Sequence, residues 1–153
     1  MILAAIDIGS NAARLLIAQT SVYVDGSVDF TKLNLLRIPL RLGFDVFDDG
    51  KISDEKKIQL IETMRAYKLL MNIYKVEHMR ACATSAMRDA SNGEIIRQEV
   101  LQATGINIEI ITGHQEASII YETHIADKLS NNKSYLYVDV GGGSTEVTMF
   151  ANN

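Results

Sequence analysis

The chain has 153 residues, of which 47% are hydrophobic and 22% are charged, and it carries a net charge of −4 with a pI near 5.3. These values are typical of one folded domain with a sizeable core, and they exclude intrinsic disorder. No basic stripe or polybasic run is present, so we expect neither nucleic acid nor a membrane surface as a partner. The N-terminus lacks the basic segment of a signal peptide, and no stretch is long enough to span a bilayer, which favours a cytoplasmic protein.

The first half of the chain predicts three strands and then a helix. The strands are apolar runs bounded by turn residues, at residues 2–8, 14–20 and 28–42. Pro39 indicates that the third strand lies at least partly at an edge of the sheet. Ser53 is the expected N-cap of the helix, and apolar residues at steps of three and four carry its buried face to about Tyr74.

In the second half, short apolar runs alternate with helical segments. We expect strands at residues 79–83, 106–111 and 135–139, and helices at 91–105 and 112–129. Ser91 with Glu94, and Thr112 with Gln115, have the spacing of a capping box. The alternation predicts an α/β fold in which a mixed five-stranded sheet carries helices on its faces, followed by a separate β-hairpin. The single cysteine, Cys82, lies within one of the apolar runs and is expected to be buried and unreactive.

One pattern occurs twice, at residues 5–11 and 138–146. In both segments an apolar run contains an aspartate, Asp7 or Asp139, shortly before a glycine turn. Glycine tolerates positive φ, which lets the backbone N–H groups of a turn close on an anion. The aspartate can hold a divalent cation against a phosphate. A single aspartate before glycine is usually a turn former, but the repeat favours two turns that grip a polyphosphate from both sides.

Two further charged residues follow predicted strands, at the edge where α/β proteins collect ligands. Arg88 comes shortly after the strand at 79–83, and it is either a surface ion-pair partner of Asp89 or a phosphate clamp. Glu116 falls in the first turn of the helix that begins at Thr112, where the helix dipole favours a charged carboxylate. It is either a helix-stabilising surface residue or a base that accepts a proton from water.

These segments together resemble the exopolyphosphatase and guanosine pentaphosphate phosphatase family of the actin-like ATPase superfamily. The resemblance rests on five ordered segments, at residues 7–11, 41–43, 83–88, 113–117 and 139–146. It implies two ribonuclease-H-like domains around a cleft. Residues 1–130 would form the first domain, and residues 131–153 would form the first hairpin of the second domain.

The resemblance also implies a role for each candidate site residue. Glu116 would be the catalytic base, and Mg²⁺ or Mn²⁺ would lie near Asp7, Asp139 and Glu146. The residues that bind the phosphates would be Gly9, Ser10, Asn11, Arg88, Gly141, Gly142, Gly143, Ser144 and Thr145. Two departures from the family pattern, Ala12 and Gln115, bear on substrate preference more than on activity.

The expected reaction is release of terminal orthophosphate from polyphosphate or from guanosine pentaphosphate, and we expect a homodimer. Two alternatives stay open at this point, an ATP-dependent kinase of the same superfamily and a non-catalytic sensor of polyphosphate or guanosine tetraphosphate. Only three residues follow Phe150, too few to complete the second domain that the resemblance implies. The chain is therefore expected to be part of a longer protein and to have little activity by itself. Its hairpin is expected to fold back, to be disordered or to pair with another copy. The unpartnered apolar side chains would be Tyr135, Tyr137, Val147 and Met149.

Overall fold

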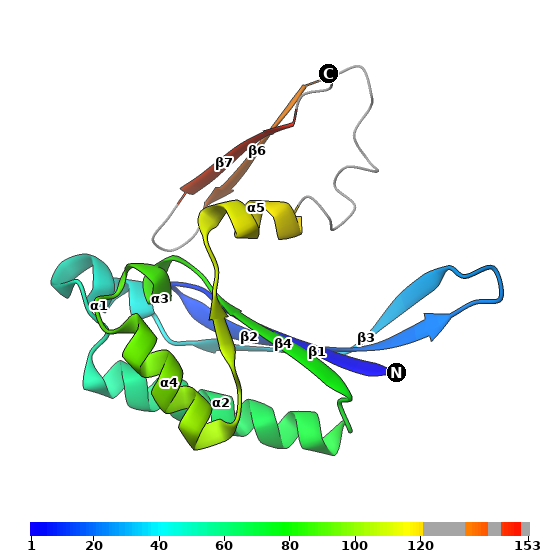
Figure 1. The fold of residues 1–153 in the computed structure, drawn as a ribbon, viewed down its shortest axis with the longest axis horizontal. Helices are drawn as coiled ribbons and strands as arrows, with labels where there is room; N and C mark the ends of the chain where they lie inside the picture. Colours follow the sequence, from blue (N-terminus) through cyan, green and yellow to red (C-terminus); the bar gives the residue numbers. More distant parts are fainter. Residues whose placement is uncertain (121–133, 141–144, 151–153) are drawn as a thin grey trace.

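A computed structural model describes residues 1–120, 134–140 and 145–150 of the chain. The strands are β1 (Ile2–Ile8), β2 (Ala12–Val22), β3 (Val28–Pro39), β4 (His78–Ala83), β5 (Ile108–Ile110), β6 (Tyr135–Val140) and β7 (Thr145–Phe150). The helices are α1 (Leu42–Asp49), α2 (Asp54–Ile73), α3 (Ser85–Asp89), α4 (Gly93–Thr104) and α5 (Gly113–Ile120). Figure 1 shows one main sheet with α2 and α4 on one side of it, and a hairpin of β6 and β7 beyond α5.

The main sheet has five strands in the order β3-β2-β1-β4-β5. Strands β1, β4 and β5 are parallel, whereas β2 pairs with β1 and β3 in antiparallel fashion, so the predicted mixed sheet is confirmed. Strand β3 lies at an edge, where Pro39 was expected. The parallel strands end together, and the ladder continues past them because Thr84 N–H donates to Ile8 O at 3.1 Å and Ile111 N–H donates to Ala83 O at 3.0 Å. This carboxyl edge carries the candidate site.

The core lies between the sheet and the two long helices. Every second residue is buried from Ala4 to Ile8 in β1 and from Ala13 to Ile17 in β2, as alternation along a half-covered strand requires. Helix α2 supplies Leu60, Met64 and Tyr67, each fully buried, and these residues belong to the predicted apolar stripe. Ser53 caps α2 as predicted, since its Oγ accepts a hydrogen bond from Lys56 N–H at 3.4 Å.

Tyr67 makes the strongest pH-dependent contribution to stability that we expect from this core. Its hydroxyl donates to Ala13 O at 2.9 Å, and burial raises the pKa of Tyr67 to about 12. Replacing it with Phe should lower the free energy of unfolding by about 1 kcal/mol at neutral pH. The unfolded tyrosine ionises near pH 10 while the folded one keeps its proton to about 12, so this contribution is complete below pH 10 and is lost as the pH rises through 12.

Urea unfolding of the wild type and of Tyr67→Phe at neutral and alkaline pH measures this effect. The difference between the two proteins should shrink between pH 10 and about 12. Tyr23→Phe, at a half-exposed position, is the control and should leave stability at neutral pH unchanged. A difference that stays constant up to pH 12 would contradict the assignment.

Two helices were missed by the sequence analysis, α1 and α3. Residues 40–42 were assigned to the end of a strand, but β3 ends at Pro39 and α1 begins at Leu42. The two buried residues Leu42 and Val46 have helical spacing, but the run between them contains Gly43 and Asp45 and reads as a loop. Helix α3 has five residues, too few for a periodic pattern to emerge. Tertiary contacts decide both.

The predicted capping box at Ser91 and Glu94 is wrong. Helix α4 begins at Gly93, its N-cap Asn92 makes no side-chain cap, and Ser91 Oγ donates instead to Gly50 O. The Asn92 side chain bonds both the N–H and the O of Ile52, which ties α4 to the segment before α2. The strand expected at 106–111 is also shorter, because β5 spans Ile108–Ile110, whereas Gly105 ends α4 as predicted.

The hairpin of β6 and β7 forms a separate two-stranded sheet, and β7 contacts α5. Paired positions place one row of side chains on a single face, and the apolar members of that row are all exposed: Leu136, Val138, Val140, Val147 and Met149. The prediction of exposed apolar surface is therefore confirmed for Val147 and Met149. The side chains of Tyr135 and Tyr137 lie outside the described part of the structure. Within the described residues, no helix is both long and apolar enough to cross a membrane.

Candidate active site

The turn between β1 and β2 is tied into the body of the domain. Ser10 is buried, and its Oγ lies 2.8 Å from Ser85 Oγ at the start of α3. Gly9 N–H donates to Ala12 O at 3.0 Å and so closes the turn. The conformational reason given for Gly9 is wrong, because the glycines with positive φ in the described residues are elsewhere: Gly26, Gly50 and Gly105. Residues 9–11 therefore form a rigid turn whose own hydrogen bonds fix its shape.

Helix α1 packs on this turn at close range. Gly43 N–H donates to Ser10 O at 2.8 Å, and Arg41 N–H donates to Asn11 O at 2.9 Å. A Cβ atom at Gly43 would lie 3.0 Å from Ser10 Cβ and 2.9 Å from Phe47 Cε2, closer than ordinary van der Waals contact. The segment 41–43 was noted only for its family resemblance. The structure shows that it holds the turn in place and that a glycine is needed for the approach.

Arg88 lies in the last turn of α3 and is surrounded by oxygen atoms. Its Nη1 donates to Ile111 O at 3.1 Å, and its Nε lies 3.5 Å from Asp89 Oδ1. The ion pair with Asp89 considered from the sequence is therefore present, but Arg88 also faces the segment that leads into α5. Its side chain is about one-quarter exposed, so it can still reach a ligand at the carboxyl edge.

Glu116 is brought next to Arg88. The capping box predicted at the start of α5 is confirmed, because Gln115 N–H donates to Thr112 Oγ1 at 3.2 Å and Thr112 N–H donates to Gln115 Oε1 at 2.9 Å. Gln115, one of the two departures from the family pattern, therefore has a structural role, because its side chain caps the helix. The Glu116 side chain is 21% exposed, its Oε2 atom is buried, and this oxygen lies 3.9 Å from Arg88 Nη1. Two residues that lie 28 positions apart thus form one charged pair.

Of the three predicted metal ligands, Asp7 is the one whose side chain the structure describes. Asp7 Oδ2 pairs with Arg14 Nη1 on the neighbouring strand at 3.1 Å, and both side chains are about half exposed. In the described ranges, no three His, Cys, Asp or Glu side chains lie close enough to hold a metal ion. Asp139 and Glu146 are directly paired positions of β6 and β7, and paired positions share one face of a hairpin. Residues 141–144, with the triple-glycine turn and Ser144, lie outside the described residues.

Thr145 and Cys82 occupy two further positions considered from the sequence. Thr145, one of the expected phosphate-binding residues, begins β7, pairs with Val140 and is exposed. Cys82 is partly buried, and this burial raises the pKa of its thiol. The charge of Arg80 lowers that pKa, and the charges of Glu109 and Asp7 raise it further. The raised pKa agrees with the predicted unreactive thiol, although the burial is less complete than expected.

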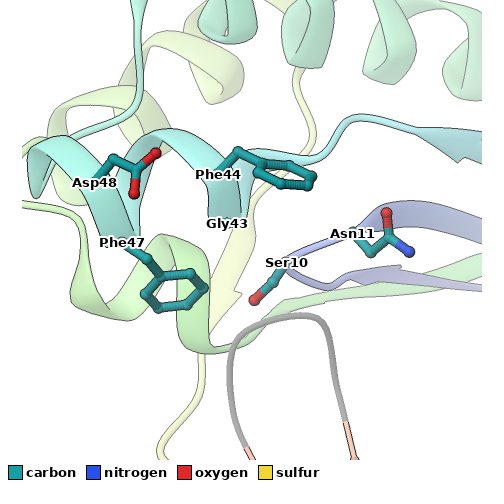
Figure 2. A pocket seen from close by; sticks show the side chains of 6 residues that line it. All are labelled: Ser10, Asn11, Gly43, Phe44, Phe47 and Asp48. Carbon is teal, nitrogen blue, oxygen red and sulfur yellow. The ribbon is translucent and has the colours of Figure 1, made fainter.

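A pocket of about 300 Å³ opens beside the β1–β2 turn. Figure 2 shows the side chains that line it, which come from the turn and from α1: Ser10, Asn11, Gly43, Phe44, Phe47 and Asp48. The sequence analysis gave no role to the α1 residues of this pocket, since α1 itself was not predicted. The signal available was the pair Phe44 and Phe47, three residues apart.

Comparison with known proteins identifies the family. A profile described as "Ppx/GppA phosphatase family" matches residues 21–153. The chain belongs to the Ppx/GppA phosphatase family. Among solved structures, a Ppx/GppA family member from Aquifex aeolicus matches with a TM-score of 0.82 at 33% identity, over 99% of this chain and 48% of that one. This match confirms the ribonuclease-H-like, actin-like fold of the main sheet.

Curated members of the Ppx/GppA family match almost the whole of this chain, but the match covers less than half of each relative. A guanosine-5′-triphosphate,3′-diphosphate pyrophosphatase from Vibrio vulnificus is 31% identical, over 94% of this chain and 28% of the relative. Exopolyphosphatase 2 from Mycobacterium tuberculosis is 32% identical, over 95% of this chain and 47% of the relative. The chain therefore spans less than half the length of these Ppx/GppA relatives.

Proposed function

We propose that this chain supplies the water-activating and phosphate-binding residues of a phosphohydrolase that releases terminal orthophosphate from inorganic polyphosphate or from guanosine pentaphosphate. The observation that carries the proposal is the approach of Glu116 Oε2 to Arg88 Nη1, at 3.9 Å, at the carboxyl edge of the parallel strands. Membership in the Ppx/GppA phosphatase family supports the reaction class.

The chemistry explains why this pair suits phosphoryl transfer. The protein has little covalent work to do in that reaction, so catalysis depends on positioning and on stabilising charge. A guanidinium group can bind two phosphate oxygens at once, which suits Arg88 to clamp the terminal phosphoryl group. A carboxylate within reach of the same group can accept a proton from the attacking water, which is the role we assign to Glu116.

The β1–β2 turn would hold the next phosphates of the substrate. Ser10 and Arg88 are connected through α3, because Ser10 Oγ bonds Ser85 Oγ and Arg88 lies one turn further along the same helix. The turn and the clamp therefore form one rigid unit. Such preorganisation is what a substrate with several charged groups needs, since no reorganisation energy is then spent in the transition state.

Asp139 and Glu146 suit a divalent cation, with Asp7 as a further carboxylate near the turn. Paired positions on a hairpin bring two carboxyl-bearing residues together, and Mg²⁺ prefers oxygen ligands of this kind. Bound Mg²⁺ or Mn²⁺ would neutralise part of the negative charge of the phosphates.

Phosphate release from polyphosphate, guanosine pentaphosphate and ATP, measured with Mg²⁺ on the longest available form of the protein, tests the proposal. Release from either of the first two substrates, with little from ATP, is the expected result. Phosphate transfer from ATP to an acceptor would favour the kinase alternative. Tight binding of polyphosphate without any release would favour the sensor.

We expect Asp139→Ala to weaken Mg²⁺-dependent pyrophosphate binding far more than it weakens folding, because Asp139 lies at the end of β6 rather than in the core of the main sheet. Calorimetric titration with pyrophosphate, with and without Mg²⁺, measures the effect, and thermal unfolding reports on folding. Asp29→Ala, in the exposed part of β3, is the matched control. Equal affinities of the Asp139→Ala protein and the wild type in Mg²⁺ would contradict a metal role for Asp139.

A further inference from the structure

The pocket between the β1–β2 turn and α1 has the composition of a site for a planar base. We propose that it binds the guanine base of guanosine pentaphosphate, with Phe44 and Phe47 against the ring and Asp48 on its hydrogen-bonding edge. This inference rests on the proposed function, since it takes the adjacent turn to hold the phosphates. It goes further by giving this chain a means to select a guanine nucleotide over polyphosphate.

The two phenylalanines are placed to stack on a ring. Phe44 is 68% exposed and Phe47 is 47% exposed, although both are large apolar side chains. They lie three residues apart on α1 and therefore on neighbouring positions of one helix face. The close approach of Gly43 to Phe47 Cε2 keeps the Phe47 ring beside Ser10, as Figure 2 shows. Stacking on an aromatic side chain is typical of sites that bind a base.

Asp48 supplies selectivity for guanine. A carboxylate only accepts hydrogen bonds, and one edge of guanine presents two donors side by side, the ring N1–H and the exocyclic amine. Adenine presents an acceptor at N1, which a carboxylate repels, and polyphosphate has no base. Asp48 lines the pocket, and no ion pair within the described residues involves it, so its oxygens are available.

The pocket is linked to the Arg88 and Glu116 pair through Ser10. Ser10 lines the pocket and also bonds Ser85 at the start of the helix that carries Arg88. A ligand with its base in the pocket would therefore direct its phosphates along the turn toward Arg88 and Glu116. The volume of about 300 Å³ is at the lower end of the range for small-molecule sites, which suits a base with part of its ribose.

The test is calorimetric titration, in Mg²⁺, of three probes into the same chain: guanosine pentaphosphate, the corresponding adenosine pentaphosphate and tripolyphosphate. The wild type should bind the guanosine compound most tightly. Phe47→Ala should weaken both nucleotides about tenfold, the loss expected from one stacking contact, and should change tripolyphosphate affinity little. Asp48→Asn should remove the preference for guanine over adenine. Phe47→Leu keeps an apolar side chain against Gly43, so it separates the loss of stacking from a displacement of the β1–β2 turn.

Asp49→Asn, on the same helix but outside the pocket, and Phe30→Ala, an exposed phenylalanine of β3, are the matched controls and should behave like the wild type. Equal affinity of the wild type for the two nucleotides, or an equal loss for all three probes in both Phe47 variants, would overturn the base site. Failure of the wild type to bind tripolyphosphate would count against the proposed function instead. A preference for guanine that Asp48→Asn abolishes would still support the pocket.

Discussion

Replacing Glu116 with Gln should lower the rate of phosphate release by about 10²–10⁴-fold, the usual cost of losing a positioned general base. Glutamine has nearly the same shape as glutamate but cannot take a proton from water. The capping box of α5 and the contact of α5 with β7 do not depend on the Glu116 charge, so the helix should remain in place. The loss should appear in kcat, with KM nearly unchanged, because the base acts in the transition state.

The measurement is the rate of phosphate release at saturating and limiting polyphosphate, in Mg²⁺, on the longest available form of the protein. Glu109→Gln is a suitable control, because Glu109 forms an exposed ion pair with Arg80 at 2.8 Å, and exposed pairs contribute little. Activity of the Glu116→Gln variant at the wild-type rate would refute the assignment of Glu116 as the base. A loss that appears only in KM would give Glu116 a role in binding instead.

Replacing Arg88 with Ala should reduce kcat/KM by about 10²–10³-fold, the range found when one preorganised donor to the transition state is removed. Here KM should rise together with the fall in kcat, because the guanidinium group binds the phosphate before and during the reaction. The variant also removes the donor to Ile111 O and the cation beside Glu116 Oε2, so a loss of stability of about 1–3 kcal/mol is expected as well.

Arg88→Lys separates the chemical role from the structural one. Lysine keeps the positive charge but lacks the planar fork that binds two phosphate oxygens, so its activity should lie between those of the wild type and Arg88→Ala. Arg65→Ala, at an exposed ion pair of α2, is the control for loss of an arginine. If Arg88 served only as the ion-pair partner of Asp89, Arg88→Ala would retain nearly full activity per folded molecule, which thermal unfolding measured in parallel would establish.

Apart from the missed helices α1 and α3, the order of the helices and strands was predicted from local patterns, and so was the cap of α2. The alternation of β1 and β2 and the apolar stripe of α2 follow from burial on one face, which is a property of the chain itself. The cap at Ser53 and the capping box at Thr112 are also local, because donor and acceptor lie within three residues of each other. Where the interacting groups are distant in sequence, as for Asn92 and Ile52, the local pattern gave the wrong answer.

The sequence by itself determined which residue types stand at the ends of the parallel strands, and through the family resemblance it determined the reaction class that we propose. The tertiary structure decided which of them meet. The contact between Arg88 and Glu116 depends on parallel pairing of β4 with β5, and the bond between Ser10 and Ser85 depends on parallel pairing of β1 with β4. The pocket exists because Gly43 allows α1 to pack against the turn. Such contacts join residues brought together by chain crossovers, and no periodicity along a single segment encodes them.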